Sequence, residues 1–121
     1  MMRAALLFAM LTTCATAQAE PAREGNRVFQ TNCARCHGAQ ADGDTPIAKV
    51  VKPPPPDLRR TPLSEAQIRE IVTHGGEGVG RSPIMPNWGF QLSPEDIDAV
   101  VAYVNGLKGS VDGVKSAARS Q

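Results

Sequence analysis

Two cysteines and a histidine lie within five consecutive residues of this chain, in the segment CARCH, as Cys33, Cys36 and His37. Three kinds of chemistry use these residue types at this spacing. A CxxC pair can cycle between dithiol and disulfide, cysteine and histidine can bind a structural zinc ion, and CxxCH is an attachment sequence for covalent haem. The rest of the sequence distinguishes among the three.

The zinc and dithiol interpretations each lack a required element. A structural zinc site needs four ligands, and His74 is the only histidine left to complete one. A thiol oxidoreductase carries its CxxC after a strand, and no strand-like alternation precedes Cys33. Cysteines three residues apart near a helix end project to one side, with Cβ atoms about 5–6 Å apart. This spacing suits thioether bonds to the two vinyl groups of one haem edge, with His37 held against the iron. We therefore predict one covalently bound haem c on Cys33 and Cys36.

The first 19 residues have the pattern of a secretory signal peptide. Arg3 supplies a positive charge, the run AALLFAML is apolar, and the segment ends in Ala17-Gln18-Ala19, a small-x-small cleavage site. The apolar run is shorter than the ~20 residues that span a bilayer, so we expect no membrane span in the mature chain. An uncleaved anchor and a lipid on Cys14 are the alternatives. We predict cleavage of residues 1–19 and export to the periplasm.

Charge and composition exclude some partners and indicate a cofactor. Loss of Arg3 with the leader lowers the basic count from 13 to 12, equal to the 12 acidic residues, and this balance argues against nucleic acid as a partner. The mature chain has four aromatic residues but 11 glycines and 10 prolines. Chains of this size bury only about 60–70% of the surface exposed when unfolded. A flat apolar cofactor such as haem would supply the missing core.

The helical signals predict an all-α domain over residues 20–108. A first helix is expected over 21–34, although Gly25 inside it costs about 1 kcal/mol relative to alanine. Residues 38–62 show no helical period. A second helix begins after Ser64, which forms a capping box with Gln67, and it ends at Gly75-Gly76. A long loop leads to a third helix with Ser93 as N-cap, Pro94 as first residue and an apolar stripe to Leu107. Residues 109–121 are polar and aperiodic, and we expect a flexible tail.

With these motifs in place, residues 22–107 resemble the monohaem class I cytochromes c. CARCH is the strongest match. The segment SPIMPNWG is similar to the loop that supplies the second axial iron ligand, which the resemblance assigns to Met85. The segment PPPPDL is similar to the turn after the attachment site, in which a proline carbonyl accepts from the axial histidine and a leucine packs on the haem. By motif these are Pro56 and Leu58. The resemblance implies three main helices and long loops around one haem.

The resemblance also explains the unfavourable glycine in the first helix. In this family the first and last helices cross at a glycine, and an aromatic residue follows four positions later. Gly25 and Phe29 match this pattern, and we expect them to face Val100 and Tyr103.

Other residues admit simpler interpretations. His74 is an alternative axial ligand, but a histidine near a helix C-terminus also interacts well with the helix dipole. Met85 lies between Pro83 and Pro86 in a loop where it has no obvious core role, which favours Met85. Three arginines (Arg59, Arg60 and Arg81) are candidates to reach a haem propionate. Asp42 and Asp44 are predicted to form a turn rather than a calcium site. Trp88 belongs either beside the haem or in the core.

An iron with ligands on both faces has no open position for a substrate, and methionine ligation raises its potential. We therefore predict an electron carrier rather than an enzyme: a periplasmic monomer that exchanges single electrons with redox partner proteins. One alternative is a haem-bearing subunit of a larger oxidoreductase. The other is a ligand sensor or peroxidase, which would need a labile sixth ligand.

Overall fold

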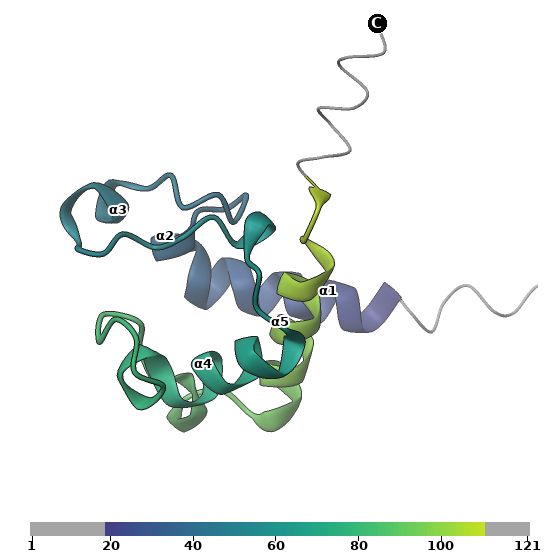
Figure 1. Cartoon of the computed structure of the whole chain (residues 1–121). Coiled ribbons are helices and arrows are strands. Elements are labelled where there is room, and N and C mark those ends of the chain that lie inside the picture. The colour runs from purple at the N-terminus through teal and green to yellow at the C-terminus, as the bar shows by residue number, and fades with distance from the viewer. Residues whose placement is uncertain (1–18, 111–121) are drawn as a thin grey trace, which may run out of the picture.

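The fold is described from a computed structural model, which defines residues 19–110. Most of the predicted leader (1–19) and of the predicted tail (109–121) lies outside this range, so the domain limits of 20–108 stay predictions. The described part of the chain is all-helical and contains no strand, which confirms the predicted fold class (Figure 1).

The helical elements follow one another around a single centre. In chain order they are α1 (Ala19–Val28), the π-helical turn η1 (Phe29–Cys33), α2 (Ala34–His37), α3 (Pro46–Val50), the 3₁₀ turn η2 (Leu58–Arg60), α4 (Glu65–Gly78), the 3₁₀ turn η3 (Trp88–Phe90) and α5 (Pro94–Gly106). Because α1, η1 and α2 are contiguous, one long helix runs over residues 19–37. The helix predicted over residues 21–34 is therefore longer at both ends.

The long helix widens at the turn η1, between Phe29 and Cys33. The amide of Ala34 donates to the carbonyl of Phe29, five residues earlier instead of four. The Asn32 side-chain amide donates to the carbonyl of Val28 at 3.0 Å, so a side chain satisfies a main-chain carbonyl where α1 meets η1. The extra residue rotates the cysteine motif relative to the face that α1 turns toward α5.

The helices α1 and α5 cross at Gly25. A Cβ atom on residue 25 would overlap the carbonyl oxygen of Ala99 and would lie 2.7 Å from the Cβ of Tyr103. The rings of Phe29 and Tyr103 pack with centroids 5.3 Å apart and planes tilted by 48°. The predicted crossing is confirmed with one change. Gly25 faces Ala99 and Tyr103, while Val100 lies in the core beside Phe29.

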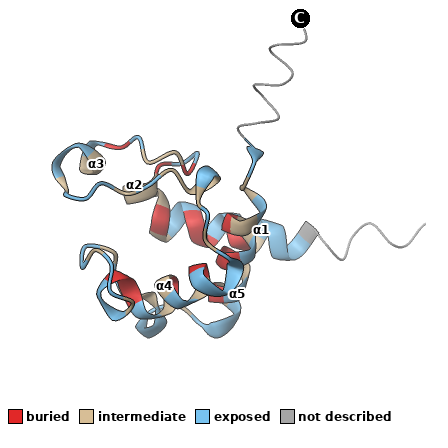
Figure 2. Ribbon diagram, in the orientation of Figure 1, coloured by how far each residue is buried: buried red, intermediate tan, exposed pale blue. Residues whose placement is uncertain are grey.

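The buried core lies where α1, α4 and α5 meet, as the buried segments in Figure 2 show. It is a small cluster of mainly aliphatic side chains: Val28, Phe29, Cys33, Ala41, Ile68, Val72, Ile97, Val100, Val101 and Val104. By contrast, the segment around α3 is mostly exposed or half-buried. The protein therefore has one packed half and one half with little core of its own.

Two helix starts follow the sequence closely. The Ser64 hydroxyl accepts from the amide of Gln67 at 3.2 Å, and the Gln67 side chain accepts from the Ser64 amide at 2.9 Å, which confirms the capping box. The Ser93 hydroxyl accepts from the amide of Asp96 at 3.1 Å. These caps fix where α4 and α5 begin and hence which faces they turn to the core.

The region over residues 38–62, predicted to lack helix, contains α3 and η2. Thr45 caps α3 by accepting from the amide of Ala48 at 3.1 Å, and Pro46 is its first residue. The Thr45 hydroxyl is also placed to donate to the carbonyl of Cys36 at 3.1 Å. A helix of five residues is too short to show a helical period, which is why the pattern missed it.

Candidate functional site

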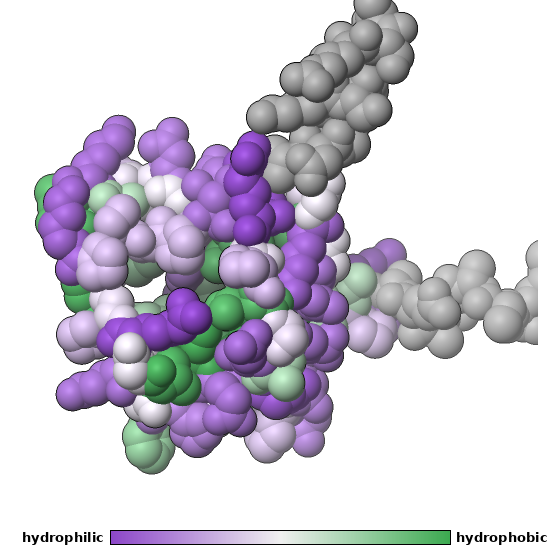
Figure 3. All heavy atoms as spheres, in the orientation of Figure 1, coloured by the Kyte–Doolittle hydropathy of each residue, from purple (hydrophilic) through white to green (hydrophobic). Residues whose placement is uncertain are grey.

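A cavity of about 590 Å³ lies between the long helix, the segment around α3, and the α4 half of the molecule. Figure 3 shows this side of the molecule hollowed, with apolar surface inside the hollow. Its wall is mainly apolar and contains these aliphatic, aromatic and proline residues: Phe29, Ile47, Val51, Pro53, Pro54, Pro55, Pro56, Leu58, Pro62, Leu63, Ile68, Ile71, Val72, Ile84, Met85, Pro86, Val100 and Val104. Cofactor sites have this size and character.

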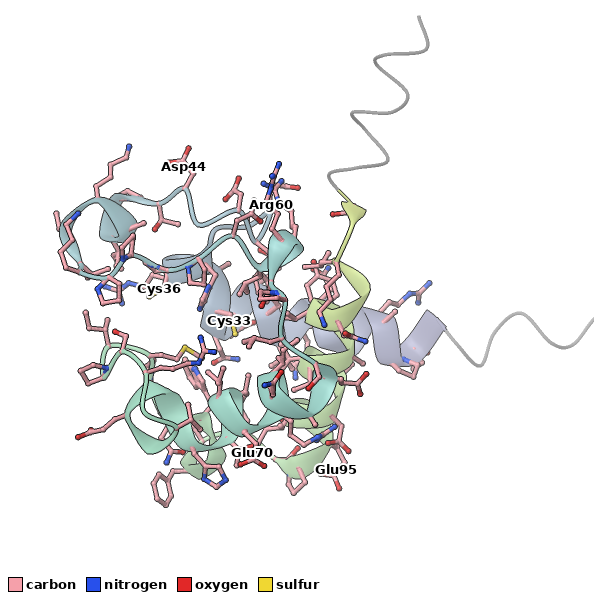
Figure 4. All side chains as sticks on the ribbon, viewed as in Figure 1. Cys33, Cys36, Asp44, Arg60, Glu70 and Glu95 are labelled. Atoms are coloured by element: carbon pink, nitrogen blue, oxygen red, sulfur yellow. The ribbon has the colours of Figure 1, made fainter. Side chains whose placement is uncertain are left out.

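The two cysteines of the CARCH segment both line the cavity, and no disulfide joins them. Figure 4 shows Cys33 and Cys36 on the same helix, beside the space between the two halves. Burial, and then the neighbouring Cys36, raises the pKa of the Cys33 thiol to about 11. A redox dithiol needs a thiolate near neutral pH, so this environment is unsuited to disulfide exchange.

His37 ends α2 and also lines the cavity. Burial lowers the pKa of its imidazole, and the main-chain carbonyl of Pro56 partly opposes this effect. The Nδ1 atom is buried and makes no hydrogen bond of normal geometry with a described residue. An unsatisfied buried nitrogen costs about 1–3 kcal/mol, so Nδ1 is suited to a closer hydrogen bond with the Pro56 carbonyl, which would leave Nε2 for a partner inside the site. Burial therefore favours the neutral form of the ring, which is the form that ligates a metal.

The proline segment is held against the loop that follows the cysteine motif. A Cβ on Gly43 would lie 2.7 Å from the carbonyl oxygen of Pro55, and Gly43 has the positive φ of +74°. The amide of Leu58 donates to the carbonyl of Ala41 at 2.9 Å. These contacts bring Pro56 and Leu58, both singled out from the sequence, into the cavity wall on the His37 side.

Met85 lines the cavity from the loop after α4 and is half-buried. The amide of Gly76 donates to the Met85 carbonyl at 3.0 Å, and a Cβ on Gly76 would overlap the carbonyl oxygen of Ser82. The second glycine of the pair therefore allows the Met85 loop to lie directly on the end of α4. The sequence predicted Gly75-Gly76 only as the end of the helix. Helical geometry does break at Gly75, with φ 74° and ψ 172°, before one further turn.

His74, the alternative ligand, lies outside the cavity wall. Its side chain is 54% exposed, and its Nε2 lies 3.5 Å from a carboxylate oxygen of Glu70, one turn earlier in α4. The geometry thus brings Met85 together with Cys33 and His37 and leaves His74 on the surface.

The three candidate arginines separate into two kinds. The Arg59 guanidinium forms two hydrogen bonds of 2.9 Å with Asp57, is absent from the cavity wall, and holds the pKa of that carboxyl below its usual range. Arg60 and Arg81 both line the cavity, and Nε of Arg60 lies 3.5 Å from Asp57.

The positions of Trp88 and Asp42 in the structure bear on two further alternatives left by the sequence. Trp88 packs against the core and is absent from the cavity wall, which favours the core role. Asp42 accepts from the amide of Asp44 at 3.1 Å, as a turn former does. The described residues contain no group of three or more histidine, cysteine or acidic side chains arranged to hold a metal ion directly.

The residues present fit a covalently bound haem. The wall is mainly apolar, and two thiols, a largely buried histidine and a methionine line it. Haem iron needs only axial ligands from the protein, because the porphyrin supplies the other four. Together, an all-helical fold and a CxxCH motif that opens into an apolar cavity define a c-type cytochrome.

The comparison with known families agrees with this assignment to the c-type cytochromes. Residues 20–104 match the family described as cytochrome c oxidase, cbb3-type, subunit III, and the chain belongs to this family. The match identifies a cytochrome c domain, whose cofactor is haem c.

Curated relatives of two lengths are similar to this chain. The cbb3-type cytochrome c oxidase subunit CcoP of Cereibacter sphaeroides is 34% identical over 90 residues, which are 71% of this chain and 27% of CcoP. Subunit FixP of Azorhizobium caulinodans is 32% identical over 82% of this chain and 31% of FixP. Cytochrome c6 of Bryopsis maxima is 35% identical over 66% of this chain and 84% of its own length. The chain thus spans less than a third of the oxidase subunits but most of a cytochrome c6.

Among solved structures, a chain of the reducing HAO-like protein complex of Kuenenia stuttgartiensis has a similar fold. The TM-score is 0.59, with 20% identity, over 74% of this chain and 43% of the other. Among residues 19–110, no helix is both long and apolar enough to cross a membrane.

Proposed function

We propose that this chain is a periplasmic one-electron carrier in which Cys33 and Cys36 hold one haem c and His37 and Met85 are the axial ligands of its iron. When bound, the haem supplies an Fe(II)/Fe(III) couple. The observation that carries the proposal is that these four side chains, from two separate parts of the chain, enter one apolar cavity.

Each residue has a distinct task in this proposal. His37 is kept neutral by burial, so that a ring nitrogen is free to act as a ligand. The main-chain carbonyl of Pro56, which already affects the His37 pKa, would orient the ring, and Leu58 would pack against the cofactor. Met85 is presented by a loop stiffened by flanking prolines, which lowers the entropy lost when its sulfur is fixed. The apolar wall excludes water and so limits reorganisation around a changing charge.

Covalent attachment is tested by mass. The mature protein, matured with haem, should have the mass of residues 20–121 plus one haem, and the haem should survive acid–acetone extraction. A mass that shows a Cys33–Cys36 disulfide, or haem released by extraction, would contradict the proposal. The same measurement reports whether the leader is cleaved after Ala19.

Axial ligation is tested by the weak far-red charge-transfer band of a ferric iron–methionine sulfur bond. Met85→Ala should abolish the band, lower the reduction potential and let carbon monoxide bind the ferrous protein. His74→Ala should do none of these. Loss of the band in His74→Ala alone would show that the ligand assignment is wrong.

A second candidate function is supported by the relatives that are oxidase subunits. In this alternative the chain is a haem-bearing electron-transfer part of a larger oxidoreductase complex. The carrier is favoured because the match with a cytochrome c6 covers 84% of that protein, whereas the matches with the two oxidase subunits cover less than a third of each. Purification from the native membrane and soluble fractions distinguishes the two, since a carrier should elute as a monomer and a subunit should elute with its complex.

A further inference from the structure

The helix that carries the cysteine motif ends at His37, and the last carbonyl groups of a helix need partners from outside it. Two of these carbonyls belong to Cys36 and His37, which the proposed function assigns to the cofactor. The amide of Gly43 donates to the His37 carbonyl at 2.8 Å, and the Thr45 hydroxyl donates to the Cys36 carbonyl at 3.1 Å. The loop after the motif therefore holds the end of α2 at two neighbouring carbonyls.

Thr45 is the one polar residue that is buried within residues 19–110, with 7% of its surface exposed. A hydroxyl has one proton to donate and lone pairs with which to accept. The Thr45 hydroxyl donates to Cys36 and accepts from the amide of Ala48 at 3.1 Å, where it caps α3. One buried oxygen thus joins the end of α2 to the start of α3, which lie beside each other in Figure 1.

The backbone turns this side chain inward. Thr45 is extended, with φ −137° and ψ 158°, and side chains alternate in direction along an extended segment. Its neighbours Asp44 and Pro46 are both exposed. Figure 4 shows Asp44 directed away from Cys36. The hydroxyl therefore stands at the buried position of these three residues.

The helix α3 forms part of the cavity wall but has little to hold it there. Ile47 and Val51 line the cavity, whereas Val50 is 77% exposed. Within the described part of the chain, no residue of α3 belongs to the packed core. Isolated helices shorter than about 12–15 residues are marginal in water. The position of this five-residue helix therefore depends on its ends, and Thr45 holds the first of them.

We propose that Thr45 is a positioning residue, whose hydroxyl fixes the α3 part of the cavity wall to the main chain of Cys36. It thereby sets how Cys36 and His37 face the cavity and how closely the wall shuts it. This inference rests on the proposed function and adds a residue that acts on the haem only through others.

Loss of the hydroxyl has a predictable direction. The Cys36 carbonyl would lack its donor, α3 would lose its cap, and water would enter the site beside α3. Solvent access controls the potential of a metal site, and water stabilises the more highly charged ferric form. The reduction potential of the haem-bearing protein should therefore fall.

The first experiment compares two substitutions by potentiometric titration of the haem-bearing protein. Thr45→Val keeps the shape of the side chain and removes the hydroxyl. At a fixed applied potential it should shift the Fe(II)/Fe(III) ratio about two- to tenfold toward Fe(III), the range equivalent to one hydrogen bond. Thr45→Ser keeps the hydroxyl and should restore the parental ratio.

Ser93→Ala is a matched control for loss of a helix cap. Ser93 precedes Pro94 and caps α5, just as Thr45 precedes Pro46 and caps α3, but Ser93 is exposed. Ser93→Ala should lower the denaturant midpoint, as loss of a cap does, and leave the potential unchanged. A parental potential in Thr45→Val, or equal shifts of potential in Thr45→Val and Ser93→Ala, would overturn the proposal.

The second experiment measures hydrogen exchange of backbone amides in the ¹⁵N-labelled ferrous protein. The Gly43 amide donates to the His37 carbonyl and not to Thr45. Its exchange should nevertheless become faster in Thr45→Val, by a factor similar to the change in the redox ratio, and stay parental in Thr45→Ser. Amides of α5 should not change. A Gly43 amide that exchanges at the parental rate in Thr45→Val would show that the hydroxyl does not hold the end of α2.

The parent protein alone provides a further test. Because the Thr45 hydroxyl is buried and hydrogen-bonded, its proton should exchange with water slowly enough to give a resolved ¹H resonance. A hydroxyl proton averaged with water would contradict the inference even if Thr45→Val does not fold. A parent protein that carries no covalent haem would instead refute the proposed function.

Discussion

At the crossing of α1 and α5, main chain approaches main chain: Gly25 leaves no room for even one methyl group beside Ala99. Across the cavity, the segment around α3 and the Met85 loop face each other over a space of about 590 Å³. The first region is held by packing within the protein. The second has apolar residues on both sides of a space that only a cofactor fills. The comparison indicates that the chain encodes half of a core and that the haem completes it.

Removal of haem attachment should change the stability of the protein more than any other variant. In Cys33→Ala with Cys36→Ala, the cavity wall loses its apolar partner, and we expect loss of cooperative unfolding and most of the helical circular dichroism at room temperature. The free energy of unfolding of small domains is only about 5–15 kcal/mol, so a protein with half of its core removed retains little stability. An apo protein that still unfolds cooperatively, with protected amides in α4, would show that the second region does not depend on haem.

Gly25→Ala tests the packed region alone. The added Cβ must push α1 away from Ala99, and overpacking of this kind costs about 1–3 kcal/mol. Denaturant unfolding of the holoprotein measures the loss. Gly106→Ala is the matched control, because a Cβ on this residue of α5 meets nothing within 4 Å and should be neutral or slightly stabilising. An unchanged midpoint in Gly25→Ala would contradict the close crossing.

Gly76→Ala tests the boundary between the two regions. A Cβ on Gly76 would overlap the Ser82 carbonyl and lie 3.3 Å from the Cβ of Met85, so the Met85 loop must shift. We expect a weaker far-red ferric band and a smaller loss of global stability than in Gly25→Ala. Absorbance at the band and denaturant midpoint are read on the same samples. A full-strength band would mean that Met85 presentation does not depend on this contact.

Asp57→Asn should have the smallest effect. Arg59 lowers the pKa of Asp57, so the ion pair contributes stability above the unfolded pKa of the carboxyl, and this contribution is lost as pH falls through the lower folded pKa. Asparagine can still accept from the Arg59 amide but carries no charge. The variant should be slightly less stable than the parent at neutral pH, and the difference in thermal midpoint should vanish in acid. A difference that grows on acidification would contradict the assignment.

The sequence predicted the packed region in more detail than the cavity. The caps at Ser64 and Ser93 and the glycine at residue 25 are local signals with direct structural meaning, and the structure has each of them in place. The CARCH motif is likewise a local signal, and it indicated the cofactor before any geometry was known.

Other features of the site arise from contacts between distant segments, which no local pattern reports. The hydrogen bond between Gly76 and Met85 and the one between Leu58 and Ala41 became visible only in three dimensions. The helix α3 is too short for periodicity, although Thr45 followed by Pro46 was a capping signal that could have revealed it.

The wide turn η1 has a consequence for anyone who would transplant this motif into a designed bundle. One residue of α-helix corresponds to a rotation of about 100°. A designer who copied residues 19–37 onto an ideal α-helix would keep every side chain, yet would turn Cys33, Cys36 and His37 by roughly that angle away from the direction set by Gly25. A design that reuses this motif must therefore copy the π-helical turn as well as the sequence.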